Sequence, residues 1–188
     1  PGKVFDDHYL RFRFAGGSKL VPTAELGRFI HLNINCTFLR RSTLEENGLR
    51  FNTRIKPNFE DAHLLQRYMF LASQNYVCFL AEAKYYYRRR ASLSSLVQTA
   101  PRDPNWYGDQ LEYGYLALLE ECRERFGQIP RFVQNVVFGD LRRQLLEVVD
   151  REDNVAFLDA EQKQRFEKLL RAIYSHIPAD VICEFNIS

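Results

Sequence analysis

The spacing of apolar residues changes near residue 105, and this change limits which folds the chain can adopt. Beyond that point, apolar residues recur at the three- and four-residue intervals typical of amphipathic helices. The spacing predicts helices over residues 107–126, 132–149 and 160–174. Gly127 favours a break after the first of them, because glycine commonly ends a helix. We therefore expect residues 105–188 to form an α-helical C-terminal extension.

Before residue 105, short apolar or aromatic runs are broken by Gly, Pro and Asn, a pattern typical of strands and loops. Leu10, Phe12 and Phe14 alternate with two arginines, which predicts a half-buried strand. Aromatic residues and arginines on one strand would also suit RNA binding, although nothing else in the chain supports that function. A helix is expected over 60–73, and further strands are expected over 29–34, 76–81 and 84–90. Residues 1–104 are thus predicted to form an α/β domain.

The charge composition argues against one broad class of function. Charged residues make up 27% of the 188 residues, yet the formal net charge is only +2. General nucleic-acid binding relies on an excess of basic residues, so we expect no nucleic-acid partner. The chain starts with Pro1, carries no signal peptide and has no apolar run long enough to span a bilayer. These features favour a soluble piece of a longer protein.

The cysteines favour a reducing environment. They are far apart in the sequence and lack the paired spacing of a zinc site. Each has apolar or aromatic neighbours, so we expect reduced thiols packed in a core, in a protein of the cytoplasm. The four are Cys36, Cys78, Cys122 and Cys183.

The first candidate site is the acidic pair Glu60 and Asp61 at the start of the predicted helix 60–73. A carboxylate there lies near free backbone amides and the positive end of the helix dipole, so it should remain ionised. An ionised carboxylate beside a loop can act as a general base on a hydroxyl group. The alternative is structural: Asn58 would cap the helix and Asp61 would complete a capping box.

The second candidate site is the run of three tyrosines and three arginines at 85–90, followed by a serine-rich loop. Guanidinium groups at the end of a strand could bind a diphosphate, which here would fall to Arg88 and Arg90. The loop, with Ser92, Ser94 and Ser95, could close over a bound nucleotide. The alternative is a solvated strand edge that is protected by charge.

A third candidate is the polar segment 33–42, which is predicted to run from a strand into a short helix. Its side chains could line a pocket, or they could satisfy local backbone groups. Asn35 and Arg40 are its candidate residues. The run Asp6, Asp7 and His8 is interpreted as a polar turn, because no further metal ligands lie nearby in the sequence.

In order, these pieces resemble the second half of a family 2 glycosyltransferase domain. The resemblance rests on residues 37–42 (TFLRRS), 46–51 (ENGLRF), 58–61 (NFED) and 85–90 (YYYRRR). A closer similarity, to glycosyltransferase domains of bacterial teichoic-acid and capsule polymer synthases, covers nearly the whole chain. It is carried by segments 10–17 (LRFRFAGG), 55–61 (IKPNFED), 94–99 (SSLVQT), 133–137 (VQNVV) and 140–141 (DL).

The resemblance implies a partial GT-A (Rossmann-like) α/β fold over 1–104, comprising the acceptor side of the domain, followed by the helical extension 105–188. It implies inverting transfer of a sugar from a nucleotide-diphosphate sugar to a hydroxyl of a cell-surface polymer. Asp61 would be the base and Glu60 would help to hold the acceptor. The remaining roles would fall to Asn35 and Arg40 on the acceptor side, Arg88 and Arg90 at the donor diphosphate, and Ser92, Ser94 and Ser95 in the lid loop.

The first half of such a domain, with its aspartate-rich metal motif, is not in this sequence. A Mg or Mn ion is therefore expected for the intact enzyme, with ligands outside this chain, and the chain alone is expected to be incomplete. We expect the enzyme in the cytoplasm, where it could associate peripherally with the inner face of the membrane. The alternative function is a non-catalytic helical module for binding or assembly. Glycerophosphate transfer from CDP-glycerol is less favoured, because the chain has no paired histidine motif.

Overall fold

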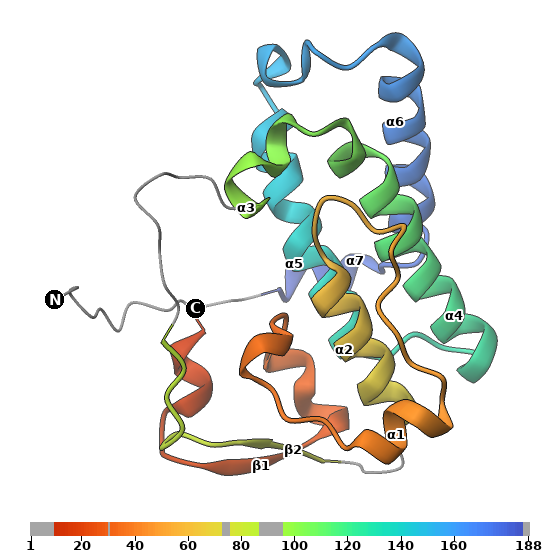
Figure 1. Ribbon diagram of the computed structural model, residues 1–188. Helices are drawn as coiled ribbons and strands as arrows, with labels where there is room; N and C mark the ends of the chain where they lie inside the picture. The colour runs from red at the N-terminus through yellow and green to blue at the C-terminus, as the bar shows by residue number, and fades with distance from the viewer. Residues whose placement is uncertain (1–9, 30, 73–75, 87–95, 186–188) are drawn as a thin grey trace, which may run out of the picture.

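The computed structural model describes residues 10–29, 31–72, 76–86 and 96–185, and helices dominate these residues (Figure 1). A π-helix at Gln110–Leu116 runs directly into the α-helix that follows it. The longer α-helices are α2 (Glu60–Leu71), α4 (Ala117–Phe126), α5 (Arg131–Val148) and α6 (Ala160–Tyr174), and the shorter ones are α1 (Arg41–Glu46), α3 (Leu96–Thr99) and α7 (Ala179–Cys183). The 3-10 helices are Arg11–Phe14, Thr23–Arg28, Ile34–Cys36, Ala100–Arg102, Pro104–Tyr107 and Glu152–Val155.

The predicted C-terminal helices are confirmed. α5 and α6 occupy 131–148 and 160–174, and the first predicted helix is formed by the π-helix and α4 together. α4 ends at Gly127, whose positive φ of 68° is the left-handed conformation that glycine adopts most easily. α6 begins with a capping box between Asp159 and Gln162, which satisfies two backbone amides at the start of the helix.

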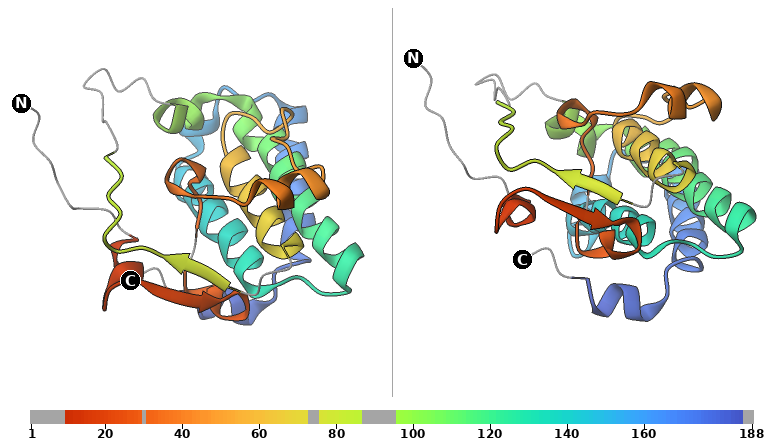
Figure 2. Two further views of the ribbon diagram at one scale, coloured as in Figure 1. Left: turned by 60° about the horizontal axis from the view of Figure 1, so that its bottom comes forward. Right: turned by 90° about the horizontal axis from the view of Figure 1, so that it is seen from below.

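Among the described residues, fewer strands form than the sequence predicts. β1 (Lys19–Pro22) pairs antiparallel with β2 (Tyr76–Phe79), with Lys19 opposite Phe79 (Figure 2). β2 confirms the strand expected over 76–81. Two other expected strands, 29–34 and 84–90, are not found among the described residues: residues 29, 31–33 and 84–86 are in neither a strand nor a helix, and Ile34 begins a 3-10 helix. The described residues thus give a mostly helical, mixed structure with one two-stranded sheet, which is consistent with part of an α/β domain, while the GT-A arrangement stays a prediction.

The strand predicted at Leu10–Phe14 is wrong, because residues 11–14 form a 3-10 helix. Phe14 is exposed, whereas Leu10 is buried and so is Arg13. Its guanidinium lies 5.6 and 5.7 Å from the ring centroids of Phe14 and Phe79, and its Nε donates to the Leu10 carbonyl at 3.2 Å. These contacts offset the cost of removing the Arg13 guanidinium from water. The alternation of arginine with apolar residues therefore does not show that this arginine is exposed.

The segment 33–42 also differs from the prediction in its first half. Its helix is confirmed as α1, but a 3-10 turn at Ile34–Cys36 replaces the expected strand. The hydroxyl of Thr37 donates to the carbonyl of Asn33 at 2.9 Å, and the Cys36 thiol lies 3.5 Å from the same oxygen. Such local side-chain bonds stabilise a turn at the expense of an extended strand.

The four cysteines are free thiols, as expected, but only Cys122 is buried. The predicted core packing is wrong for Cys36, Cys78 and Cys183, which are exposed. Cys78 shows the reason. It lies on β2 opposite Leu20 of β1, which is exposed as well, so apolar neighbours in the sequence do not ensure burial.

The core is built from both sides of residue 105. α2 lies beside α4 and the π-helix, and the 3-10 helix Thr23–Arg28 packs on α5 (Figures 1 and 2). The Asn135 amide of α5 donates to the carbonyl of Gly27 at 2.6 Å. One cluster of buried apolar residues joins these elements, and it includes Leu26, Ile55, Phe59, Ala62, Met69, Tyr115, Leu118, Val133 and Val137.

Candidate functional site

The candidate site lies at the amino-terminal end of α2. Phe59 precedes the helix in the left-handed conformation, with φ of 88°, and its carbonyl accepts the first helical hydrogen bond from the His63 amide at 2.9 Å. Phe59 is the N-cap residue of α2, and its side chain makes no capping hydrogen bond. The alternative in which Asn58 caps α2 is therefore wrong, and Asp61 is not part of a capping box.

Asp61 contacts a different part of the chain. Its Oδ2 accepts a hydrogen bond from the backbone amide of Ile34, which lies 27 residues earlier, at 3.3 Å. This bond ties the 3-10 turn Ile34–Cys36 to the first turn of α2. Asn35 is the next residue of that turn, and its side chain is exposed. The structure thus brings Asp61 and Asn35, two of the predicted site residues, to one place.

Arg40 lies along the same side of α2. Its backbone amide donates to the hydroxyl of Tyr68 at 2.9 Å, and Tyr68 is about two helical turns beyond Asp61. The Arg40 side chain is exposed. Its positive charge therefore stands in solvent at the flank of the helix that carries the acidic pair.

Both carboxyl groups of the pair are half-buried. Burial raises the pKa of Asp61, against a smaller lowering by the Ile34 amide. Burial also raises the pKa of Glu60, and the neighbouring Asp61 adds to that rise, while the backbone amide of Glu60 and Lys56 oppose it. The shift is thus opposite to the one expected from the helix end alone. A carboxylate with a raised pKa is a stronger base, which suits proton abstraction near neutral pH.

A chain of hydrogen bonds holds the loop that faces Asp61. The pKa of His31 is lowered to about 4 by burial and by Arg13, so the ring is neutral at pH 7. Its Nδ1 accepts from the Arg13 guanidinium at 2.9 Å, which leaves the proton on Nε2 for the Thr37 hydroxyl at 2.6 Å. The Gln66 amide of α2 donates to the His31 carbonyl at 3.0 Å.

These supporting residues were not among the site residues predicted from the sequence. Gln66 offered one signal, since it is a polar residue on the apolar face of α2, and it is fully buried. Arg13 and His31 offered none, because their partners are distant in the sequence.

Five of the predicted site residues fall outside the described residues. They are Arg88, Arg90, Ser92, Ser94 and Ser95. The run Asp6, Asp7 and His8 falls outside as well. Within the described part of the chain, no group of three His, Cys, Asp or Glu side chains could hold a metal ion. Among those same residues, no helix is long and apolar enough to cross a membrane.

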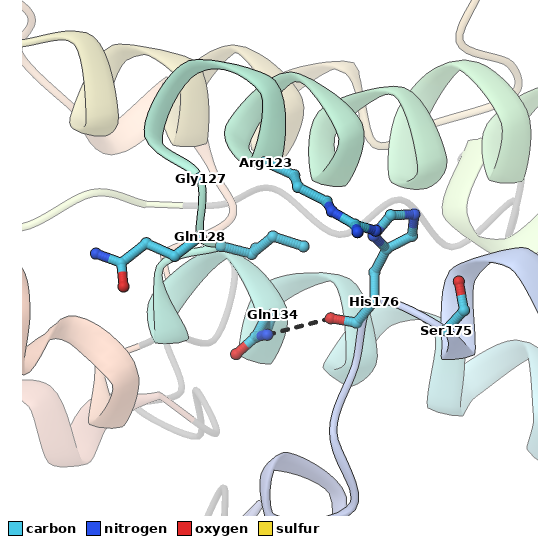
Figure 3. Close-up of a pocket in the computed structure, with 7 residues that line it drawn as sticks. Arg123, Gly127, Gln128, Gln134, Ser175 and His176 are labelled. Atoms are coloured by element: carbon cyan, nitrogen blue, oxygen red, sulfur yellow. Dashed lines mark hydrogen bonds between the residues drawn. The ribbon is translucent and has the colours of Figure 1, made fainter.

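A pocket of about 260 Å³ lies away from the acidic pair, between the end of α4, the start of α5 and the end of α6 (Figure 3). Figure 3 shows the Arg123 and His176 side chains pointing toward one another there, and Gln134 donating to the His176 carbonyl at 3.1 Å. None of the predicted site residues lines this pocket, whose lining is Arg123, Gly127, Gln128, Ile129, Gln134, Ser175 and His176.

Comparison with known proteins agrees with the resemblance found in the sequence. The chain is 31% identical over 156 residues to the minor teichoic acid biosynthesis protein GgaB of Bacillus subtilis (strain 168), a match that covers 82% of this chain and 16% of GgaB. It is 28% identical over 166 residues to the minor teichoic acid biosynthesis protein GgaA of the same organism, covering 84% of this chain and 36% of GgaA. No protein-family model and no solved structure matches.

These matches place the chain in a class, namely relatives of bacterial proteins of teichoic acid biosynthesis. More closely, it is related to segments of the minor teichoic acid biosynthesis proteins GgaA and GgaB. The chain spans about a third of GgaA and less than a fifth of GgaB.

Proposed function

We propose that this chain is the acceptor-side part of an inverting glycosyltransferase that builds a cell-surface polymer of the teichoic acid type. The observation that carries the proposal is the environment of Asp61. This carboxylate is half-buried, has a raised pKa and is held by the backbone of a second loop, although it serves no cap of its own helix. The names of the two relatives support the choice of pathway.

In this mechanism Asp61 removes the proton from an acceptor hydroxyl as the hydroxyl oxygen attacks the anomeric carbon of the donor sugar. The new bond forms between that oxygen and the anomeric carbon, and the bond from the anomeric carbon to the diphosphate oxygen breaks. The diphosphate leaves with the electron pair, and the configuration at the anomeric carbon inverts. Glu60, beside the base, would hold other acceptor hydroxyls. Arg88 and Arg90 would bind the departing diphosphate, and Ser92, Ser94 and Ser95 would cover the donor.

The raised pKa of Asp61 predicts a pH dependence. The base acts only when it is deprotonated, so the rate falls as the pH drops through its pKa. Because burial raises that pKa, the fall begins at a higher pH than for an exposed aspartate.

A divalent ion, Mg or Mn, is expected for the whole enzyme. The described residues offer no ligand cluster for it. We therefore assign no step of this chain's chemistry to the metal, whose ligands would lie elsewhere in the protein. We also propose that the enzyme works in the cytoplasm, at the inner face of the membrane.

The test is donor turnover by the intact protein that contains this chain, screened over UDP-, GDP- and CDP-linked sugars with Mg or Mn. Asp61→Asn keeps an oxygen that can accept from the Ile34 amide but removes the base, and loss of a general base costs a factor of about 10² to 10⁴ in rate. Asp153→Asn, the same change at an exposed position, is the matched control and should leave turnover unchanged.

The outcomes separate the candidate functions. Turnover that collapses in folded Asp61→Asn but survives in Asp153→Asn supports the proposed function and names the donor. Turnover that survives in both variants removes Asp61 from the mechanism. Absence of turnover with every donor favours the non-catalytic binding or assembly module.

A further inference from the structure

The π-helix Gln110–Leu116 contacts the residue that precedes the acidic pair. The rings of Tyr115 and Phe59 meet edge to face, with centroids 4.6 Å apart and planes at 90°. Gly114 lies against the Phe59 ring: a Cβ at this position would be 3.1 Å from Cδ1 of Phe59 and 3.6 Å from Cγ2 of Ile55. The absence of a side chain at Gly114 therefore makes room for Phe59.

Tyr115 is fixed by a buried polar network. Its hydroxyl donates to Oδ2 of Asp140 at 2.7 Å and accepts from the amides of Gln110 at 2.7 Å and Gln144 at 3.2 Å. One donor and two acceptor sites are the full capacity of a hydroxyl group. Arg143 forms an ion pair with the other oxygen of Asp140. The ring that packs on Phe59 thus has little freedom to move.

Phe59 needs such a contact. Its φ of 88° is unfavourable for a residue with a side chain, and such a conformation persists only when the surrounding structure enforces it. Phe59 is 6% exposed, and its carbonyl starts α2. The direction in which α2 starts determines whether the Asp61 carboxylate, two residues later, reaches the Ile34 amide.

We propose that Gly114 and Tyr115 are positioning residues that hold Phe59 and thereby orient the Asp61 carboxylate against Ile34. The catalytic part of this inference rests on the proposed function. It assigns a role to the helices after residue 105: they fix the geometry of the acidic pair. Because π-helical turns often occur at functional sites, the placement of this one beside the pair fits that role.

The test uses Gly114→Ala in the intact protein. Alanine is a better helix former than glycine, so a loss of activity cannot come from helix propensity. The added methyl group should displace Phe59, lower kcat at least tenfold and leave the KM for the donor unchanged. Tyr115→Phe keeps the ring but removes the hydroxyl that fixes it, so it should lower kcat to a lesser degree. This variant replaces Gly114→Ala if Gly114→Ala does not fold. Ile173→Val, a conservative core change in α6, is the stability control and should keep kcat per folded molecule.

Hydrogen exchange of the peptide that contains Ile34 provides a readout that does not depend on activity. Asp61→Ala removes the acceptor of the Ile34 amide and calibrates the largest increase in exchange. Gly114→Ala should increase exchange at Ile34 toward that value, while Ile173→Val should not.

The two readouts distinguish failure of the inference from failure of the proposed function. If Asp61→Asn abolishes turnover but Gly114→Ala keeps both wild-type kcat and wild-type exchange at Ile34, the positioning role is overturned and the proposed function stands. If Asp61→Asn keeps turnover, the proposed function fails. Exchange at Ile34 then tests by itself whether Gly114 and Tyr115 hold Asp61 against the Ile34 amide. Faster exchange in Gly114→Ala supports this positioning role, and unchanged exchange overturns it.

Discussion

Acid should destabilise this protein through two buried histidines. The pKa values of His31 and His63 are lowered from 6.5 to about 4, mainly by burial. The unfolded chain therefore binds more protons than the folded chain between these values. It follows that the free energy of unfolding falls as the pH drops from about 6.5 toward 4. For one such histidine, the loss between pH 7 and pH 5 is about 2 kcal/mol.

Urea unfolding followed by the fluorescence of Trp106, the single tryptophan of the chain, would measure this loss. His31→Asn should remove about half of the pH-dependent loss that the two histidines cause, and His63→Gln should remove the other half. The raised pKa values of Glu60 and Asp61 act in the opposite direction, because protonation of these groups as the pH falls raises the free energy of unfolding. Comparing each variant with the wild type at the same pH cancels that contribution. Equal losses of stability in His31→Asn and the wild type between pH 7 and pH 5 would mean that His31 does not cause the acid destabilisation.

Three further changes test the packing directly by urea unfolding. Tyr115→Phe should lower the free energy of unfolding by about 1–3 kcal/mol, because Asp140 loses a buried hydrogen-bond donor. A change within error would mean that the hydrogen bond from Tyr115 to Asp140 does not stabilise the fold. Gly127→Ala places a methyl group at a φ of 68° and should cost about 1–2 kcal/mol, whereas a gain would show that α4 ends differently. Asp159→Ala removes the capping box of α6 and should cost about 0.5–2 kcal/mol, and no loss would count against that cap.

The three longer helices after residue 105 and the position of the acidic pair at a helix start could be predicted from the sequence. α5 and α6 lie where the apolar spacing places them, and Gly127 ends α4 as expected. These features follow from interactions within a few residues along the chain, such as helical periodicity and capping. The same holds for the start of α2 at Glu60, which sets the acidic pair at a helix terminus.

The surroundings of that pair, by contrast, depend on contacts in the folded chain. The bond from Ile34 to Asp61, the burial of Arg13 against Phe79 and the contact of Tyr115 with Phe59 join segments that are distant in the sequence. Whether a carboxylate faces water or a loop, and whether an arginine is exposed, depends on which segments pack together. That packing is set by the shared core of the whole chain, and no local pattern of residues records it.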